Sequence, residues 1–313
     1  MLPSSKKQPP PSKNVKIYRV RRLNAVEPNT FVQPKQIRLI LDADADVYTE
    51  EGALLCRFRK AVLPAAAIKT FYANVIQFAN TSTSSNRGSA SGSQTKTVGT
   101  NTKIKSNVLG FMDTLSPQQK YRLRLAGTPL NLTVRPCRFN LYYPDKWVKL
   151  FPLIQAIDGI YAKLVPEKYA LQRAKADQTP FRIPATAFTT ITTNVNFQTS
   201  IHCDKGDDEE GFGNLSVIES GEYTGGETCF PEYGLGVNVR TGDVLLMDVH
   251  VWHGNLPVRP VTPDAIRLSI VCYLRTKVYQ NTKGMTQRQM RTHVKKIDAI
   301  RGGQHAPPAP PAI

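Results

Sequence analysis

The stretch FTTITTNVNFQTSIHCD, residues 188–204, is rich in β-branched and aromatic residues, which favour strands over helices. Four similar short segments follow it, separated by Gly, Asp and Asn, at 214–220, 226–239, 242–255 and 266–276. Helical patterns precede this region, at 65–79 and at 144–177, where Pro166 breaks the second one. Helices followed by closely spaced strands predict an α+β protein, a β sandwich or barrel supported by N-terminal helices, rather than a βαβ fold.

The rest of the chain suggests where this folded unit begins and ends. Residues 1–14 are rich in Pro and Lys and are predicted to form a disordered basic tail. Short alternating patterns at 16–26 and 54–64 indicate strands, and Ser116–Pro117 is a helix-start signal. The low-complexity segment 80–102 is predicted to be a mobile loop within one domain. We therefore expect a single domain over 15–280, followed at 281–313 by a basic helix and a disordered tail.

The charge of the chain points to its partners. The formal net charge is +17 and the pI is about 9.7, which favours a polyanion such as nucleic acid. Solubility alone, or attraction to acidic membranes, would give the same excess. No apolar run is long enough to span a bilayer, so we expect no membrane association. The odd number of scattered cysteines, with no C-x-x-C pair, favours a reducing, intracellular compartment.

His202 and Asp204 are the first candidate site residues. Alternate residues of a strand share a face, so both side chains can enter one cavity, while Cys203 should point to the opposite face. The acidic residues that follow allow another interpretation, a glycine-broken surface loop. A metal site needs a second histidine, and DVHVWHGN (248–255) offers His250 and His253. We favour His253 because the turn signal after it places it at a strand end, with His250 packed nearby.

The segment IRLSIVCY (266–273) adds a cation. Arg267 and Ser269 share one strand face, and an inward-facing guanidinium needs an anionic partner. That partner is either a structural carboxylate or a ligand carboxylate bound by Arg267 with help from Ser269. An H-x-D pair, a distal His and R-x-S on short strands are what a non-haem Fe(II), 2-oxoglutarate-dependent dioxygenase requires. His202, Asp204 and His253 would hold Fe(II), leaving positions for 2-oxoglutarate and O2, and Arg267 would neutralise the far carboxylate.

Two motifs, GGETCFPEYG (225–234) and GDVLLMDVHVWHGN (242–255), together with these residues resemble the TET/JBP family of 5-methylpyrimidine dioxygenases, which has phage and viral members. The resemblance covers about residues 104–276, with weaker matches at 106–113 and 183–190. It implies a double-stranded β-helix (jelly-roll, cupin-like) core, base flipping, and oxidation of the methyl group of thymine or 5-methylcytosine in DNA. It also implies a nuclear location or the cytoplasm of a phage- or virus-infected host. We expect a monomer.

The resemblance also extends to the substrate pocket. Asp207 matches an acidic position that faces the target base in some family members, and we expect it to serve catalysis and substrate binding. Its carboxylate can accept a hydrogen bond from the cytosine amine, which favours 5-methylcytosine and a 5-hydroxymethyl product, with further oxidation to formyl and carboxyl allowed. An ordinary loop position is the alternative for Asp207. The resemblance extends the same pocket to Asn194, Asn196 and Asn107.

Other functions remain open at this point. They are hydroxylation of thymine in DNA, the same oxidation on RNA, protein or a free nucleobase, and a binder without catalysis. Cationic segments at 6–22, 120–127 and 285–301 are candidates for gripping phosphates that flank a flipped base. The last of these is expected to be a helix, which could equally be exposed and bind nothing.

Overall fold

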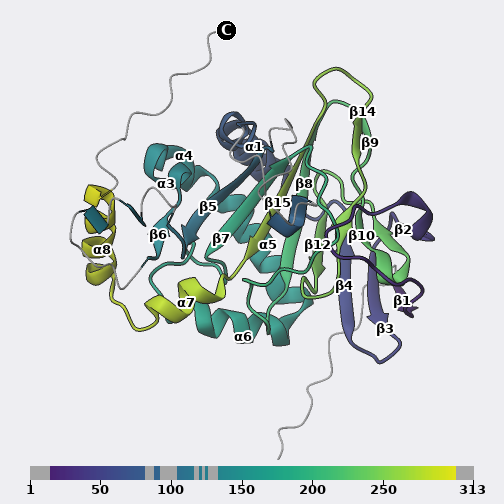
Figure 1. The fold of residues 1–313 in the computed structure, drawn as a ribbon, viewed down its shortest axis with the longest axis horizontal. Helices are drawn as coiled ribbons and strands as arrows, with labels where there is room; N and C mark the ends of the chain where they lie inside the picture. Colours follow the sequence, from purple (N-terminus) through teal and green to yellow (C-terminus); the bar gives the residue numbers. More distant parts are fainter. Residues whose placement is uncertain are drawn as a thin grey trace, which may run out of the picture.

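The computed structural model describes residues 15–81, 88–91, 104–115, 120–121, 124–125 and 133–300, with only the backbone of 88–89 and 298–300 (Figure 1). The predicted tails at 1–14 and 301–313 lie outside the described residues, as do most of the loop at 80–102 and half of the segment 120–127.

Most of the helices follow the sequence patterns, but two short ones, at 138–142 and 276–282, were not predicted. The helices are α1 (Ala65–Ala79), α3 (Arg138–Tyr142), α4 (Pro144–Lys149), α5 (Phe151–Leu164), α6 (Pro166–Ala176), α7 (Thr276–Thr282) and α8 (Gln287–Ile300), with single turns η1 (Pro34–Gln36), η2 (Gly88–Ser91) and η3 (Pro231–Tyr233). Pro144 and Pro166 stand at helix starts, where the missing N–H has no intrahelical partner to lose. The predicted break at Pro166 is confirmed, and the chain breaks again at Leu150, between α4 and α5.

Strands from both halves of the chain form two facing sheets. The larger sheet has the order β1-β3-β4-β12-β8-β15-β7-β5-β6, and the smaller has the order β13-β10-β11-β2. Their bounds are β1 (Lys16–Val20), β2 (Leu39–Leu41), β3 (Ala45–Thr49), β4 (Leu54–Arg59), β5 (Ser106–Met112), β6 (Arg135–Pro136), β7 (Thr190–Val195), β8 (Gly213–Ser220), β10 (Thr228–Phe230), β11 (Leu235–Val237), β12 (Val244–Met247), β13 (Gly254–Asn255) and β15 (Ile266–Tyr273). A two-stranded antiparallel sheet of β9 (Tyr223–Gly225) and β14 (Val258–Pro260), which the sequence did not indicate, extends from them.

The larger sheet lies between two apolar layers. One face packs under the helices, where Phe71 of α1 and Ile157 and Tyr161 of α5 contact alternate residues of β15, namely Leu268, Ile270 and Cys272. The other face packs on the smaller sheet, where Leu215, Val217, Leu245 and Met247 meet Phe230, Leu235 and Val237. This arrangement matches the predicted helix-supported sandwich. The other set of β15 residues, which alternate with Leu268, Ile270 and Cys272, faces the space between the sheets.

The C-terminal helix packs on the same body. Met290 and Val294 of α8 contact a cluster formed by Phe111, Val134, Phe181 and Val278. Figure 1 shows α8 beside β6, at the edge of the larger sheet. The boundary expected at residue 281 therefore does not separate α8 from the rest of the described structure. None of the helices in the described ranges combines the length and apolar character that a membrane crossing demands.

Candidate metal centre

Two polar segments meet between the sheets and carry the predicted ligands. His202 and His253 pair through a β-bridge, in which each backbone N–H donates to the other residue's carbonyl at 2.9 Å. The N–H of Asp204 donates to the carbonyl of Val249 at 2.9 Å. The expectation of a regular strand at His202 and Asp204 is wrong, because these residues lie in irregular backbone between β7 and β8. His253 directly precedes β13, so Gly254 and Asn255 form a short strand where the sequence predicted a turn.

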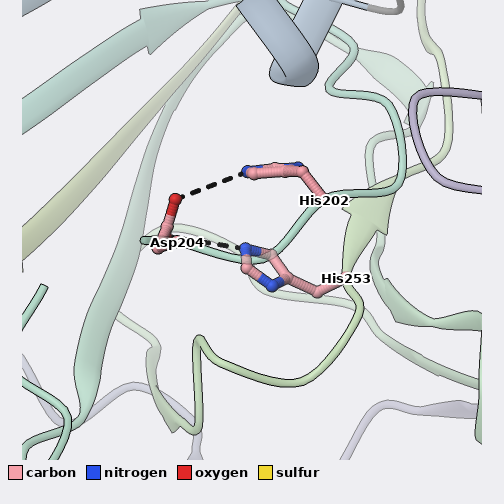
Figure 2. Close-up of side chains that lie close together, drawn as sticks. All are labelled: His202, Asp204 and His253. Atoms are coloured by element: carbon pink, nitrogen blue, oxygen red, sulfur yellow. Dashed lines mark ion pairs between the residues drawn. The ribbon is translucent and has the colours of Figure 1, made fainter. Parts of the chain in front are cut away.

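The three side chains converge. One ligand atom from each of His202, Asp204 and His253 lies within 4.8 Å of the other two. The Nε2 atoms of both histidines are 3.7 Å from the carboxylate oxygens of Asp204, one histidine to each oxygen (Figure 2). Two imidazoles and one carboxylate are the donor set of the facial triad that binds non-haem Fe(II). These three side chains therefore fit a divalent transition metal ion that the protein binds on one face only.

The backbone fixes the state of both imidazoles. The Nδ1 atom of His202 lies 2.7 Å from the carbonyl of Ser200, and that of His253 lies 2.9 Å from the carbonyl of Val251. A carbonyl only accepts, so Nδ1 carries the proton and Nε2 keeps its lone pair towards Asp204. Burial, and then the neighbouring His202, lower the pKa of His253 to about 4. The ring is therefore neutral near pH 7, as a metal ligand must be.

The other two residues near the triad do not join it. His250 is partly buried, and its Nε2 lies 3.3 Å from the carbonyl of Asp208, so it acts as the predicted packed histidine. Cys203 was expected on the opposite face, but it lies along the same cavity because the backbone here is irregular. Burial, and then the charge of Asp204, raise the pKa of Cys203 to about 11. Its thiol is therefore protonated and a poor ligand.

The triad opens into a cavity of about 320 Å³ between the two sheets. The residues of β15 that point away from the helices line it. The alternation predicted for IRLSIVCY is confirmed, because Arg267, Ser269, Val271 and Tyr273 face the cavity. Asn194 also lines it and donates from Nδ2 to the hydroxyl of Ser269 at 3.3 Å. A cavity of this size, with polar groups at fixed positions, suits a small ligand together with part of a larger one.

Arg267 is a buried cation of this cavity. It is only 5% exposed, and within the described residues its guanidinium has no carboxylate at ion-pair distance. Burial lowers the pKa of Arg267, and the largest opposing effect comes from Tyr223. The side chain passes Gly226, where a Cβ would lie 2.7 Å from its Cδ. The structural-carboxylate alternative for Arg267 is therefore not supported, and an anion in the cavity would compensate the buried charge.

Two of the predicted asparagines lie elsewhere. Asn196 does not line the cavity. Its Oδ1 accepts from the N–H of Arg267 at 2.7 Å, its Nδ2 donates to the carbonyl of Ala265 at 2.7 Å, and its backbone N–H donates to the carbonyl of Arg267 at 3.1 Å. Asn107 is buried at the end of α1, where Nδ2 donates to the carbonyls of Ala79 and Thr81 at 3.1 and 3.2 Å. Both amides are occupied by backbone groups, so neither is placed to contact a ligand in the cavity.

Asp207 does line the cavity, beside a pair that the sequence did not reveal. Its backbone forms a β-bridge with Arg275, whose guanidinium forms an ion pair with Asp113. Burial, followed by the charge of Asp204, raises the pKa of Asp207 well above its usual range, and Arg275 acts in the opposite direction. Arg275 also lines the cavity. Extending the alternation of β15 two residues beyond Tyr273 would have identified it.

Comparison with known proteins agrees with this geometry. Residues 125–276 match the family model Tet_JBP, described as the oxygenase domain of the 2OGFeDO superfamily. The chain is 38% identical over 164 residues to the bifunctional helicase and thymine dioxygenase JBP2 of Leishmania infantum, covering 51% of this chain and 15% of that protein. It is 35% identical over 151 residues to thymine dioxygenase JBP1 of Trypanosoma brucei brucei, covering 48% and 18%. The match therefore spans less than a fifth of either relative.

A solved structure agrees with the fold. NgTET1 in complex with 5mC DNA superposes with a TM-score of 0.53 at 13% sequence identity, covering 83% of this chain and 88% of that one. At this identity the likeness concerns the fold alone. It confirms the predicted α+β jelly-roll architecture with supporting helices.

Proposed function

We propose that this chain, whose residues 125–276 match the Tet_JBP oxygenase domain of the 2OGFeDO superfamily, is an Fe(II)- and 2-oxoglutarate-dependent dioxygenase acting on a 5-methylpyrimidine in DNA. The observation that carries the proposal is the convergence of His202, Asp204 and His253 in one cavity with a buried Arg267 that lacks an ion pair in the described residues. We assign the domain to residues 15–280, with α8 packed against it.

Each of these residues has a task in this proposal. His202, Asp204 and His253 would hold Fe(II), which with 2-oxoglutarate and O2 supplies the oxidising chemistry. Arg267 would bind the far carboxylate of 2-oxoglutarate through two parallel N–H donors, and the hydroxyl of Ser269 would add a third bond. Asn196 fixes the backbone that carries Arg267, and Asn194 orients Ser269. The buried surroundings strengthen these contacts, because little water competes for them.

For the base, we propose 5-methylcytosine as the first candidate, oxidised to 5-hydroxymethylcytosine and open to further oxidation to formyl and carboxyl. Asp207 supports it, since a carboxylate that lines the cavity can accept a hydrogen bond from the exocyclic amine of cytosine. A base reaches such a cavity only after leaving the stack, at a cost of a few kcal/mol.

Thymine is the second candidate, and two observations favour it. The two relatives described above, from Leishmania infantum and Trypanosoma brucei brucei, are named as thymine dioxygenases. Burial and Asp204 also raise the pKa of Asp207, and a neutral carboxyl group can donate a hydrogen bond to a carbonyl oxygen of thymine. Asp207 can therefore serve either base, depending on its protonation.

Mass spectrometry of nucleosides separates these candidates. DNA carrying 5-methylcytosine, and the same DNA with only thymine as methylated base, is incubated with protein, Fe(II) and 2-oxoglutarate. We expect a 5-hydroxymethyl product from one base, absent when 2-oxoglutarate is omitted. Asp207→Ala should lower kcat/KM for that base by about 10- to 100-fold, as expected for one lost buried hydrogen bond.

The exposed neighbour Glu209→Gln is the matched control and should leave the rate unchanged. No hydroxymethyl product from either base, on single or double strands, would contradict the proposed function. An unchanged rate in Asp207→Ala would instead mean that Asp207 is an ordinary loop residue. It would not contradict the proposed reaction.

A further inference from the structure

The C-terminal part of the structure has a one-sided charge. No acidic residue occurs from Ala265 to Ile297, whereas seven cations follow the end of β15. They are Arg275, Lys277, Lys283, Arg288, Arg291, Lys295 and Lys296. Exposed helices of soluble proteins usually mix both signs, which stabilises them through pairs three or four residues apart. Between Asp264 and Asp298 the segment has no such pair within itself, and Asp298, three residues after Lys295, is the single carboxylate in the sequence of α8.

Packing sets which side of α8 faces outward. Met290 and Val294 lie against the cluster around Phe181, Ile297 is buried, and Nε2 of His293 donates to the carbonyl of Val134 at 2.7 Å. These contacts recur at the spacing of one helix face and fix the rotation of the helix. The opposite face carries exposed cations, Arg288, Arg291, Lys295 and Lys296, which we call the α8 cationic face.

Within the described residues, none of these four side chains has a carboxylate at ion-pair distance. Arg291 and Lys295 are four residues apart, so their charges repel each other. Exposed Lys69, Lys149 and Lys163 are also unpaired there, but they are scattered over three helices. The charges of the α8 cationic face are instead concentrated on one side of a packed helix. This arrangement favours binding of a polyanionic partner over a role in solubility alone.

The position of the helix relates this charge to the cavity. The chain runs from β15, whose Arg267, Ser269 and Tyr273 line the cavity, through Arg275 directly into α7 and then α8. Arg275 is anchored to Asp113, and α8 is anchored beside β6 (Figure 1). From Arg288 to Lys296 the helix spans about 12 Å, which matches a few successive phosphates of one strand.

We propose that the α8 cationic face binds phosphates of the DNA strand that delivers its base to the cavity. This inference rests on the proposed function for the identity of the polyanion. Contacts of this kind fix a strand without reading its sequence, and the affinity they add offsets the cost of taking a base out of the stack. The face is therefore a positioning surface, remote from the reacting atoms.

The test compares two variants of equal charge. One carries Arg288→Gln, Arg291→Gln, Lys295→Gln and Lys296→Gln, and the control carries Lys35→Gln, Lys69→Gln, Lys149→Gln and Lys163→Gln at exposed positions elsewhere. Fluorescence anisotropy with a short DNA duplex gives Kd over a salt series. We expect the α8 variant to bind about tenfold or more weakly, with a shallower salt dependence, by about 0.9 in log–log slope per lost phosphate contact. The control should stay close to wild type.

Kinetics and a second probe complete the design. In the oxidation of the same duplex, the α8 variant should show a raised KM and an unchanged kcat. Equal DNA binding by the two variants would overturn the inference, as would a loss confined to binding of phosphatidylserine vesicles. A wild-type protein that binds DNA through α8 but oxidises no base would overturn the proposed function and leave the binding face standing.

Discussion

Asp204→Ala is expected to abolish oxidation of methylated DNA, with a loss of at least about a thousandfold in rate. The carboxylate of Asp204 is the metal ligand that lies close to both histidines. Each histidine Nε2 is 3.7 Å from one of its oxygens. Without it, two neutral imidazoles would remain and the negative charge that holds a divalent cation would be lost. Bound iron, measured after dialysis, should fall in parallel with the rate.

The fold should survive this change. The side chain of Asp204 is 34% exposed and does not belong to the apolar layers, so the thermal midpoint of the metal-free protein should shift little. DNA binding should stay close to wild type. His250→Asn is the matched control, because His250 lies three residues from His253 and outside the triad. Loss of iron in His250→Asn, with iron retained in His253→Asn, would contradict the ligand assignment.

Arg267→Met is expected to weaken 2-oxoglutarate binding by about 30-fold to several thousandfold, the usual cost of removing one side of a buried, hydrogen-bonded charge pair. The same change should keep the thermal midpoint of the ligand-free protein at the wild-type value or raise it. The guanidinium is 5% exposed without an ion pair in the described residues, and a thioether of similar length removes that uncompensated charge. Calorimetric titration and thermal midpoints measure the two effects separately.

An opposite pattern would count against the role of Arg267. A large fall in the thermal midpoint with unchanged 2-oxoglutarate affinity would mean that Arg267 serves the fold alone. Arg259→Met, on the exposed strand β14, is the matched control and should alter neither quantity. High 2-oxoglutarate concentration should restore part of the rate in Arg267→Met, whereas it cannot restore Asp204→Ala.

Local pattern was enough to predict much of this site. The alternation of IRLSIVCY placed Arg267 and Ser269 on the cavity side. His253, favoured over His250 from the sequence, does lie beside Asp204, although Gly254 and Asn255 form β13 and not the expected turn. Residues two apart still share a direction at His202 and Asp204, although their segment is held by a β-bridge to His253 and one backbone hydrogen bond to Val249, and not by a regular strand. The helix starts at Pro144 and Pro166 depend on proline itself, so they too were predictable.

The rest depends on contacts between distant parts of the chain. Asn107 and Asn196 have the polarity of ligand-binding residues, but their amides satisfy backbone groups at the end of α1 and beside Arg267. The pair of Arg275 with Asp113 joins residues 162 positions apart. No local pattern shows that β1, β3 and β4 extend the same sheet as β15. Tertiary hydrogen bonding therefore decides which polar residues face the cavity.

Crystals grown with Mn(II) in place of Fe(II), together with 2-oxoglutarate, test the central claim most directly, because manganese is located by its anomalous scattering. We expect one anomalous peak within bonding distance of Nε2 of His202, a carboxylate oxygen of Asp204 and Nε2 of His253. The far carboxylate of 2-oxoglutarate should lie on Arg267. A peak elsewhere, or a triad without metal while 2-oxoglutarate binds at another site, would contradict the account.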